Sequence, residues 1–472
     1  MSIIRELSAA AITDAVERLC IEANTQLPAD VKAALDKAEA AEPWPLAKET
    51  LGLLQKNLCT AKEKDLPICQ DTGMACVFVE LGHDVHIDGD LTTAVNEGVR
   101  RGYEKAYLRK SITADPLQRV NTGDNTPAFL TVHLVPGDGC QITVAPKGAG
   151  SENMSRLTML KPADGVQGVK DFVLDTVKQA GANPCPPIVL GIGIGGSFDH
   201  CAALAKQALL RPLDVPNPDP YYAALEKELL DAINATGFGP QGFGGATTCL
   251  GVAIEQRPTH VACLPWPSTS AATSPAAPAA HCKGANRMQY VLQTPLQKSD
   301  LAPLKAGDTV LLSGVVYTAR DAAHARMMEL LDKGEELPFP IEGAAVYYVG
   351  PTPERPGCAI GAAGPTTSGR MDAYTPRLLD LGLACMIGKG KRSEAVKQSV
   401  VKNGAVYLAA IGGAGALMAN SVQSCEIIAW PDLGCEAVRK LVVKDFPLTV
   451  LLDTHGGDLY QSGPAAYLAS LT

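Results

Sequence analysis

Apolar residues recur at helix and strand spacing along the N-terminal part of the chain. Ile12, Val16 and Leu19 follow one another at i, i+4 and i+7, which predicts an amphipathic helix over residues 8–24. The same reasoning predicts helical structure at 92–108 and through most of 151–180, and β-branched strands bounded by turn residues at 75–79, 128–135, 141–145 and 188–194. Helices and strands are therefore mixed from the start of the chain.

The C-terminal part alternates more regularly between strand and helix patterns. Strands are predicted at 309–316, 344–349, 384–387 and 405–410, and helices between them at 320–332, 371–381 and 392–403. Two polar segments precede this alternation, namely a Ser/Ala/Pro-rich loop at 266–281 and a proline-containing segment at 293–308. We place a domain boundary in the second segment, between residues 1–295 and 296–472, and the alternation after it predicts α/β-like layering.

Composition excludes several classes of protein. A chain of 472 residues with 46% hydrophobic and 19% charged residues can bury more than one core, so intrinsic disorder is excluded. The net charge of −9 leaves no basic surplus for binding nucleic acid. The longest uncharged stretch, 403–425, contains glycines and amides and is not expected to span a membrane. The charged N-terminal residues do not fit a secretory signal, which predicts a cytoplasmic protein.

Fourteen cysteines are spread along the chain, and the closest pair, Cys69 and Cys76, is separated by seven positions. Because no C-x-x-C occurs, a zinc ribbon and a ferredoxin-type cluster segment are excluded. In a reducing compartment we expect these thiols to be structural, reactive or metal-binding, and not disulfide-bonded.

Several motifs in the first half carry groups that could act chemically. Cys69-Gln70-Asp71 precede a glycine and a predicted strand, so a thiol, an amide and a carboxylate could face one pocket; a buried cysteine followed by an Asx-turn is the structural alternative. Arg109 could hold a carboxylate, or it could be a paired structural residue. The Gly-rich segment 146–153 could bind an anion through backbone N–H groups or simply cap a helix.

The segment 191–196 matches the pattern G-x-G-x-x-G after a predicted strand. It is the basis of a rival interpretation as a nicotinamide-dependent oxidoreductase. However, the region some twenty residues further on, 211–216, is a proline-bracketed segment and not a second strand end. The glycine motif alone is weak evidence for a dinucleotide site.

In the second half, cations and hydroxyls follow predicted strands. His260 stands alone in a turn and Cys282 precedes a basic segment, whereas Arg320, Thr366, Arg370 and Lys389 lie where helices start or strands end. Three cations and a hydroxyl at such positions predict an anion pocket, although capping and surface charge could explain each one separately.

Taken in order, these motifs resemble the iron–sulfur class I fumarate hydratase family, which includes tartrate dehydratase and mesaconase. The likeness runs through PICQDTG, YLRKS, DNTPA, PKGAGSEN, CPP and FGGATT to ARDAAHARM, GPTTSGRMD and IGKG. It covers nearly the whole chain and implies that the α and β regions of the family are fused here. It also implies an α+β fold, with a mixed α/β cluster-binding domain over 1–295 and a smaller, swivelling β/β/α domain over 296–472, and a homodimer.

The resemblance further implies a [4Fe–4S] cluster held by Cys69, Cys185 and Cys282, with one iron open as a Lewis acid. It implies substrate contacts from Gln70, Arg109, Arg320, Arg370 and Lys389. Thr366 is implied as the base that removes a proton from carbon, and Asp71 and His260 are implied on the acid side.

The expected reaction is the reversible addition of water to a small dicarboxylate, with fumarate to (S)-malate first. Tartrate dehydration and mesaconate hydration are the alternatives within the family. Two departures leave the substrate open. The segment between His260 and Cys282 is longer than the family pattern, with Cys263 as a competing thiol, and the tail at 452–460 differs from the usual ending.

Overall fold

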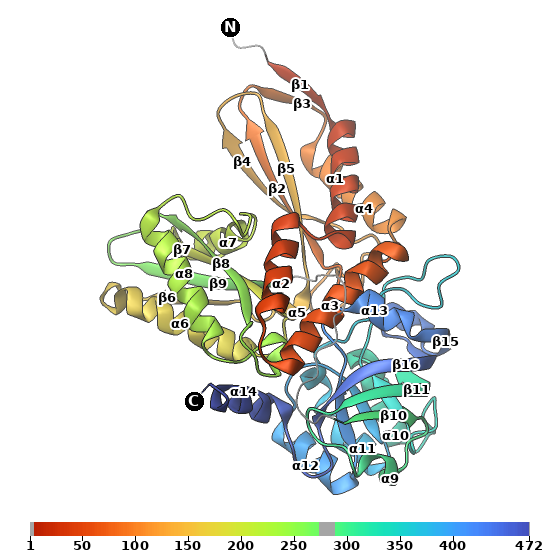
Figure 1. Cartoon of the computed structure of the whole chain (residues 1–472). Coiled ribbons are helices and arrows are strands. Elements are labelled where there is room, and N and C mark those ends of the chain that lie inside the picture. The colour runs from red at the N-terminus through yellow and green to blue at the C-terminus, as the bar shows by residue number, and fades with distance from the viewer. Residues whose placement is uncertain (1–3, 273–287, 472) are drawn as a thin grey trace.

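The computed structural model describes residues 4–272 and 288–471. Its first layer is a three-stranded sheet in which β2 (Met74–Gly82) lies between parallel β4 (Phe129–Val135) and antiparallel β5 (Cys140–Lys147). Helices α1 (Ala9–Thr25) and α4 (Leu91–Lys105) pack on one face of this sheet (Figure 1). A short parallel pair, β1 (Arg5–Ser8) and β3 (Val85–Asp88), lies beside it.

Helix α1 forms where the sequence predicts a helix, with a capping residue at its start and an apolar stripe along one side. Ser8 caps α1 by accepting a hydrogen bond from the Ala11 N–H at 3.2 Å. Ile12, Val16 and Cys20 are buried against the sheet, so the apolar stripe faces the core. The prediction of this helix, and of the helix at 92–108, is confirmed.

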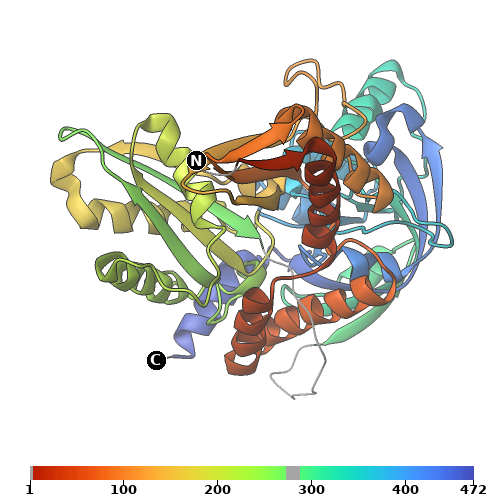
Figure 2. The same ribbon diagram turned by 90° about the horizontal axis from the view of Figure 1, so that it is seen from above.

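A second sheet has the strand order β6-β9-β7-β8. Its strands are β6 (Arg156–Leu160), β9 (Leu264–Ala272), β7 (Ile188–Gly195) and β8 (Cys249–Arg257). Helices α6 (Gly165–Ala180) and α8 (Pro220–Asn234) share an apolar core with one face, and α7 (Phe198–Ala208) packs on the other. Seen from above, this sheet and the C-terminal sheet lie on opposite sides of the N-terminal elements (Figure 2).

Two predictions for this region are wrong in part. The segment 151–180 is interrupted by β6, and the first residues of the expected loop at 266–281 belong to β9; residues 273–281 lie outside the described chain. The two strands pair with each other in antiparallel register, from Arg156↔Ser268 to Leu160↔Leu264. Each is therefore stabilised by a partner far away in sequence, which a local pattern does not reveal.

The glycines of the segment 191–196 serve packing and not a phosphate loop. Gly191 and Gly193 lie inside β7, and a Cβ atom on either would stand 2.3 Å from a carbonyl oxygen of α7, that of Ala205 or Cys201. Glycine is needed because the helix approaches the strand so closely. In a dinucleotide-binding loop the first glycines would form the turn after the strand, so the basis of the rival interpretation is lost.

The C-terminal sheet has seven strands in the order β10-β11-β12-β13-β14-β16-β15. Because β11 pairs with both β12 and β16, five of these strands close into a ring. The strands are β10 (Gln289–Gln293), β11 (Thr309–Thr318), β12 (Ala345–Tyr347), β13 (Cys385–Gly388), β14 (Val406–Ala409), β15 (Val422–Ala429) and β16 (Val438–Leu452). The helices are α9 (Lys298–Leu301), α10 (Asp321–Lys333), α11 (Thr375–Asp380), α12 (Glu394–Asn403), α13 (Gly415–Asn420) and α14 (Leu459–Ala469).

The predicted alternation of strand and helix in this part is confirmed. The sheet extends beyond the predicted boundary, because β10 lies before residue 296. Two N-terminal helices, α2 (Ala29–Ala41) and α3 (Pro45–Glu63), also contribute buried residues to the core of this sheet. The division at 295/296 therefore stays a prediction, while the mixture of helix and sheet agrees with an α+β fold. Among the described residues, no helix combines the length and apolar character needed to cross a membrane.

Candidate active site

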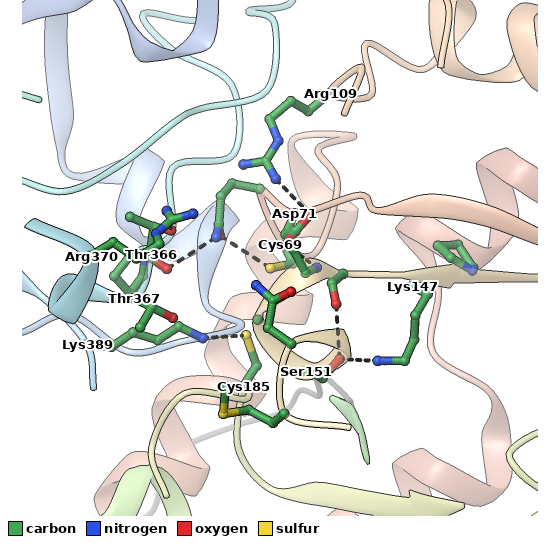
Figure 3. A pocket seen from close by; sticks show the side chains of 18 of the residues that line it. Cys69, Asp71, Arg109, Lys147, Ser151, Cys185, Thr366, Thr367, Arg370 and Lys389 are labelled. Carbon is green, nitrogen blue, oxygen red and sulfur yellow. Dashed lines mark hydrogen bonds and ion pairs between the residues drawn. The ribbon is translucent and has the colours of Figure 1, made fainter. Parts of the chain in front are cut away.

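A cavity of about 240 Å³ opens where N-terminal loops face the C-terminal sheet (Figure 3). Its lining includes nine of the residues predicted from the sequence: Cys69, Gln70, Asp71, Arg109, Cys185, Arg320, Thr366, Arg370 and Lys389. Residues from both ends of the chain therefore meet in one place.

The C-terminal cations reach the cavity because of the direction of the strands. β11, β12 and β13 are parallel neighbours, so their carboxyl ends lie at one edge of the sheet. Arg320 follows the end of β11 by two residues, and Lys389 comes directly after β13. Thr367 bridges to Lys389 beside that edge, which places the Thr366 loop next to the lysine.

On the N-terminal side, Thr72 joins the loop after α3 to Arg109 in the segment after α4. Its hydroxyl accepts a hydrogen bond from the Arg109 N–H at 2.9 Å and donates one to the Arg109 carbonyl at 3.1 Å. The buried Tyr103 hydroxyl also donates to the Thr72 carbonyl, at 2.7 Å. Asp71 and Arg109 are thereby held side by side.

Asp71 is an ionised carboxylate surrounded by donors. Its Oδ1 lies 2.7 Å from Arg109 Nη2, and its Oδ2 accepts the Ala149 N–H at 2.9 Å. Burial alone would raise the pKa of Asp71, but the charge of Arg109, the Ala149 hydrogen bond and the charges of Arg320 and Lys389 hold it below its ordinary value. The carboxylate is thus available as a proton acceptor.

The C-terminal arginines are placed by acidic neighbours. Arg320 Nη2 lies 3.1 Å from Glu436 Oε1, and Arg370 Nη2 lies 3.3 Å from Asp321 Oδ2. Arg370 Nη2 also donates to Thr366 Oγ1 at 2.7 Å. Burial lowers the pKa of Arg370, and the charge of Arg320 lowers it further. An anion entering the cavity would offset this repulsion between cations.

Cys69 and Cys185 face each other in the cavity, and Lys389 Nζ donates to Cys185 Sγ at 3.3 Å (Figure 3). The hydrogen bond between the two thiols raises the pKa of Cys69 and lowers that of Cys185, and Lys389 lowers the pKa of Cys185 further. One of the two is therefore poised as a thiolate, the form that binds iron–sulfur clusters.

These donors fit a cluster, because soft sulfur ligands face a cavity that also holds cations. The described residues provide two of the predicted ligands and contain no group of three or more His, Cys, Asp or Glu side chains placed to hold a metal. The third predicted ligand, Cys282, lies outside the described residues.

His260 lies apart from the other predicted residues. It is exposed in the turn after β8, where its Nδ1 accepts the Ala262 N–H at 3.2 Å, and it is absent from the described lining of the cavity. Its catalytic role remains a prediction.

The Gly-rich segment 146–153 was expected to bind an anion or cap a helix, and none of its residues was predicted as a site residue. Several of its side chains line the cavity, among them Lys147, Ser151 and Asn153. Lys147 Nζ donates to Ser151 Oγ at 2.6 Å and lies 3.4 Å from Glu152 Oε2 (Figure 3). A lysine next to glycines at the end of a predicted strand was the available signal. Its partners Ser151 and Glu152 are close in sequence, but the position of this segment beside the cavity depends on the fold.

Two family models match adjacent parts of the chain. Residues 13–267 match fumarate hydratase (fumerase), and residues 265–463 match the fumarase C-terminus. The first match covers more than half of the chain, and together they reach from the N-terminal helices to the last helix.

Three relatives illustrate the similarity. "Fumarate hydratase 2" of Leishmania major is 32% identical over 451 residues, which covers 86% of this chain and 78% of that protein. "Fumarate hydratase class I, anaerobic" of Escherichia coli K12 is 32% identical over 437 residues, covering 84% and 79%. "Putative L(+)-tartrate dehydratase subunit alpha" of Methanocaldococcus jannaschii is 44% identical over 262 residues, covering 54% of this chain and 91% of that protein. The chain belongs to the fumarate hydratase family.

Proposed function

We propose that this protein is an iron–sulfur-dependent hydro-lyase that reversibly adds water to fumarate to give (S)-malate. Family membership makes it a hydro-lyase. The observation that carries the proposal is the meeting of two facing thiols with several cations and a carboxylate in one cavity. A dicarboxylate and a cluster would share that space.

Binding of the substrate is assigned to the cations. Arg109 and Arg320 reach the cavity from the two sides, and Arg370 and Lys389 lie on the C-terminal side. Guanidinium groups bind carboxylates through paired hydrogen bonds, and an ammonium group acts as a point charge. Gln70 adds an amide, whose Nε2 donates to the Pro365 carbonyl at 3.3 Å and so connects the two sides.

The cluster would be held by Cys69, Cys185 and Cys282. When bound, a three-thiolate [4Fe–4S] cluster supplies a Lewis-acidic iron with a free position for a substrate carboxylate and hydroxyl. Lys389 stabilises the thiolate form of Cys185 before any metal binds.

Proton transfer is assigned to Thr366 and Asp71. A threonine hydroxyl is a weak base, but the Arg370 hydrogen bond to Thr366 Oγ1 favours its deprotonated form. In the dehydration direction Thr366 would remove the proton from carbon. Asp71, ionised beside Arg109, would accept a proton from water in the hydration direction and return it in the reverse direction. His260 is retained as a predicted partner of Asp71.

We further propose that residues 1–295 form the cluster-binding domain and residues 296–472 the domain that closes over it, and that the enzyme is a homodimer. The cavity supports the first part, because its lining divides between the two regions. Closure would bring Thr366 and Arg370 to the substrate and shield it from bulk solvent. Sedimentation equilibrium of the holoenzyme tests the dimer.

Tartrate dehydration is the second candidate. It is favoured by the 44% identity of the N-terminal region to the tartrate dehydratase alpha-subunit relative. Tartrate carries one more hydroxyl than malate, and Thr367, Ser151 and Asn153 offer polar groups in the cavity lining. Mesaconate is the third candidate and differs from fumarate by a methyl group.

The test is an anaerobic assay of purified holoenzyme with fumarate, mesaconate and each tartrate isomer. We expect the highest kcat/KM with fumarate, and no turnover after the iron has been removed with a chelator. Highest turnover with a tartrate isomer would replace the substrate assignment. If cluster-loaded protein turned over none of them, the proposed function would be refuted.

A further inference from the structure

A segment of the C-terminal region, Gly350–Arg355, follows β12 and contacts the residues around Arg109. The Gly350 carbonyl accepts a hydrogen bond from Arg109 Nη1 at 3.0 Å. On its other side Gly350 meets Arg320, because a Cβ atom at this position would lie 2.4 Å from Arg320 Nη1. The backbone at Gly350 therefore lies between two guanidinium groups that the proposed function assigns to carboxylate binding.

Arg355, at the other end of this segment, contacts the residues that precede Arg109. Its guanidinium carbon lies 5.4 Å from the centre of the Tyr107 ring, and its Nη2 donates to the Ala106 carbonyl at 3.4 Å. It also forms an ion pair with Asp65. Only 18% of the Arg355 side chain is exposed, compared with 74% for Asp65. The ion pair thus involves an exposed partner, whereas Arg355 itself is mostly buried where it contacts Tyr107 and Ala106.

The backbone held by Arg355 has an unfavourable conformation. Tyr107 has a φ of 56°, in the left-handed region that bulky residues rarely adopt. The next residue, Leu108, is fully buried, and its N–H donates to the Tyr103 carbonyl at 2.9 Å. This tight turn sets the direction in which Arg109 leaves the chain. Contacts that hold Tyr107 in place therefore also set the position of the Arg109 guanidinium.

We propose that Arg355 is a positioning residue for Arg109, acting through Tyr107 and Ala106 from the opposite region of the chain. The inference rests on the proposed function, in which Arg109 binds a substrate carboxylate. Without Arg355, the turn at Tyr107 would lose its stacking partner. The Arg109 side chain would keep its contacts with Asp71, Ser111 and Gly350, and its backbone would keep the hydrogen bonds with Thr72. A displacement of a substrate-positioning group, here the Arg109 guanidinium, by about 1 Å is enough to reduce the catalytic rate by about 100-fold.

The variant Arg355→Ala is predicted to raise KM for fumarate by about 10- to 100-fold, with a smaller change in kcat, because carboxylate binding is the affected step. Binding of succinate, a dicarboxylate without a double bond to hydrate, is measured anaerobically by titration calorimetry and should weaken by a similar factor. The visible absorption of the cluster should be unchanged, since Arg355 contacts neither Cys69 nor Cys185 in the described structure.

Two controls separate positioning from a general loss of structure. Asp65→Asn removes the charge of the exposed ion-pair partner but leaves the contacts with Tyr107 and Ala106, so we expect nearly wild-type KM. Arg355→Lys keeps a charge near Asp65 but lacks the planar group that stacks on Tyr107, so we expect it to resemble Arg355→Ala. Arg355→Lys retains the ion pair, so the same measurements of KM and succinate affinity can be made on this variant if Arg355→Ala does not fold.

The deciding measurement is the double variant Arg109→Ala/Arg355→Ala. If Arg355 acts through Arg109, its loss should change kcat/KM and succinate affinity by less than about two-fold once Arg109 is absent. Multiplicative losses in the double variant, or unchanged KM in Arg355→Ala, would overturn the inference while leaving the proposed function intact. Wild-type kcat/KM in Arg109→Ala alone would instead refute the assignment of Arg109, and the inference with it.

Discussion

The pKa values of single residues in the cavity depend on two effects, burial and the charges of neighbouring groups. Burial raises the pKa of a carboxyl and lowers that of a guanidinium, so an isolated Asp71 or Arg370 would tend towards its neutral form. At Asp71 the neighbouring cations reverse the effect of burial. At Arg370 the charge of the nearby Arg320 lowers the pKa further, in the same direction as burial. An anion that binds in the cavity would therefore offset the repulsion between Arg320 and Arg370.

Arg370 is predicted to be essential for turnover but not for cluster assembly. Replacing it with alanine removes the hydrogen bond to Thr366 Oγ1 and one carboxylate-binding cation. We expect kcat to fall by about 100- to 1,000-fold, as when a preorganised donor is lost. Steady-state kinetics and the visible spectrum of the cluster check this. Arg377→Ala is the matched control, because Arg377 pairs with Asp332 at the surface. Unchanged kcat/KM in Arg370→Ala would remove this residue from the site.

His324 lies behind Arg320 and is predicted to make stability depend on pH. Its Nδ1–H donates to the Arg320 carbonyl at 2.8 Å, and the rings of Tyr348 and Tyr374 flank it. Burial lowers the pKa of His324 to about 4, and Arg392 lowers it further, against the opposing effects of the Arg320 hydrogen bond and Asp321. The folded protein thus holds this imidazole neutral.

The unfolded chain binds a proton at His324 below about pH 6.5, whereas the folded chain resists protonation until about pH 4. The contribution of His324 to stability is therefore complete above pH 6.5 and is lost as the pH falls towards 4. We expect wild type to lose about 3 kcal/mol more unfolding free energy over this range than His324→Asn, which has no titrating group. Urea unfolding at several pH values measures the difference. Parallel pH dependences would contradict the prediction.

At the scale of elements, the cavity depends on which loops follow parallel strands. The alternation of strand and helix over residues 309–410 was predictable, because β12, β13 and β14 are short, apolar and bounded by turn residues. It follows that Arg320 and Lys389 meet at one sheet edge. The strands β10, β15 and β16 were not predicted. β6 was not predictable, since it depends on pairing with β9. Lys147 and Ser151 are only four residues apart, but they were missed as site residues because the sequence does not show that their segment lies at the cavity.

Gln241 connects two elements through a strained backbone. It lies in the short helical turn Pro240–Gly242, is only 2% exposed and has a φ of 61°. Its Nε2 donates to the Ala410 carbonyl and its Oε1 accepts the Gly412 N–H, both at 3.1 Å. The side chain thus joins an N-terminal loop to the loop beside Lys389. Such strain is kept only where other contacts compensate for it.

Gln241→Ala is predicted to lower the unfolding free energy by about 2–4 kcal/mol, because two buried hydrogen bonds are lost and the strain remains. Gln241→Gly loses the same hydrogen bonds but tolerates a positive φ, so it should be at least as stable as the alanine variant. Denaturant unfolding compares the two. An alanine variant clearly more stable than the glycine variant would show that the left-handed conformation has no energetic consequence here.

At the scale of the whole molecule, the site forms only where distant loops meet. Cys69 precedes the first sheet and Cys185 precedes a strand of the second. The spacing of the cysteines alone left the ligands open, and only the resemblance to a family selected three of them. The structure brings Cys69 and Cys185 together. The third cluster ligand is harder to assign, because the segment after His260 is longer than the family pattern. Both Cys263 and Cys282 are available as ligands in the sequence.

The third ligand is therefore the sharpest test of the whole arrangement. Cys69→Ser, Cys185→Ser and Cys282→Ser are each predicted to lose most of the visible absorption and bound iron of anaerobically purified protein, because two thiolates cannot hold the cluster as three do. Cys263→Ser is the matched control, since Cys263 lies only three residues beyond His260 and should retain full iron. Iron analysis and activity distinguish the two cysteines directly. Loss of the cluster in Cys263→Ser together with full iron in Cys282→Ser would transfer the third ligand to Cys263. It would also place the cluster next to the turn that carries His260, close enough in sequence for His260 to be re-examined as an acid at the site.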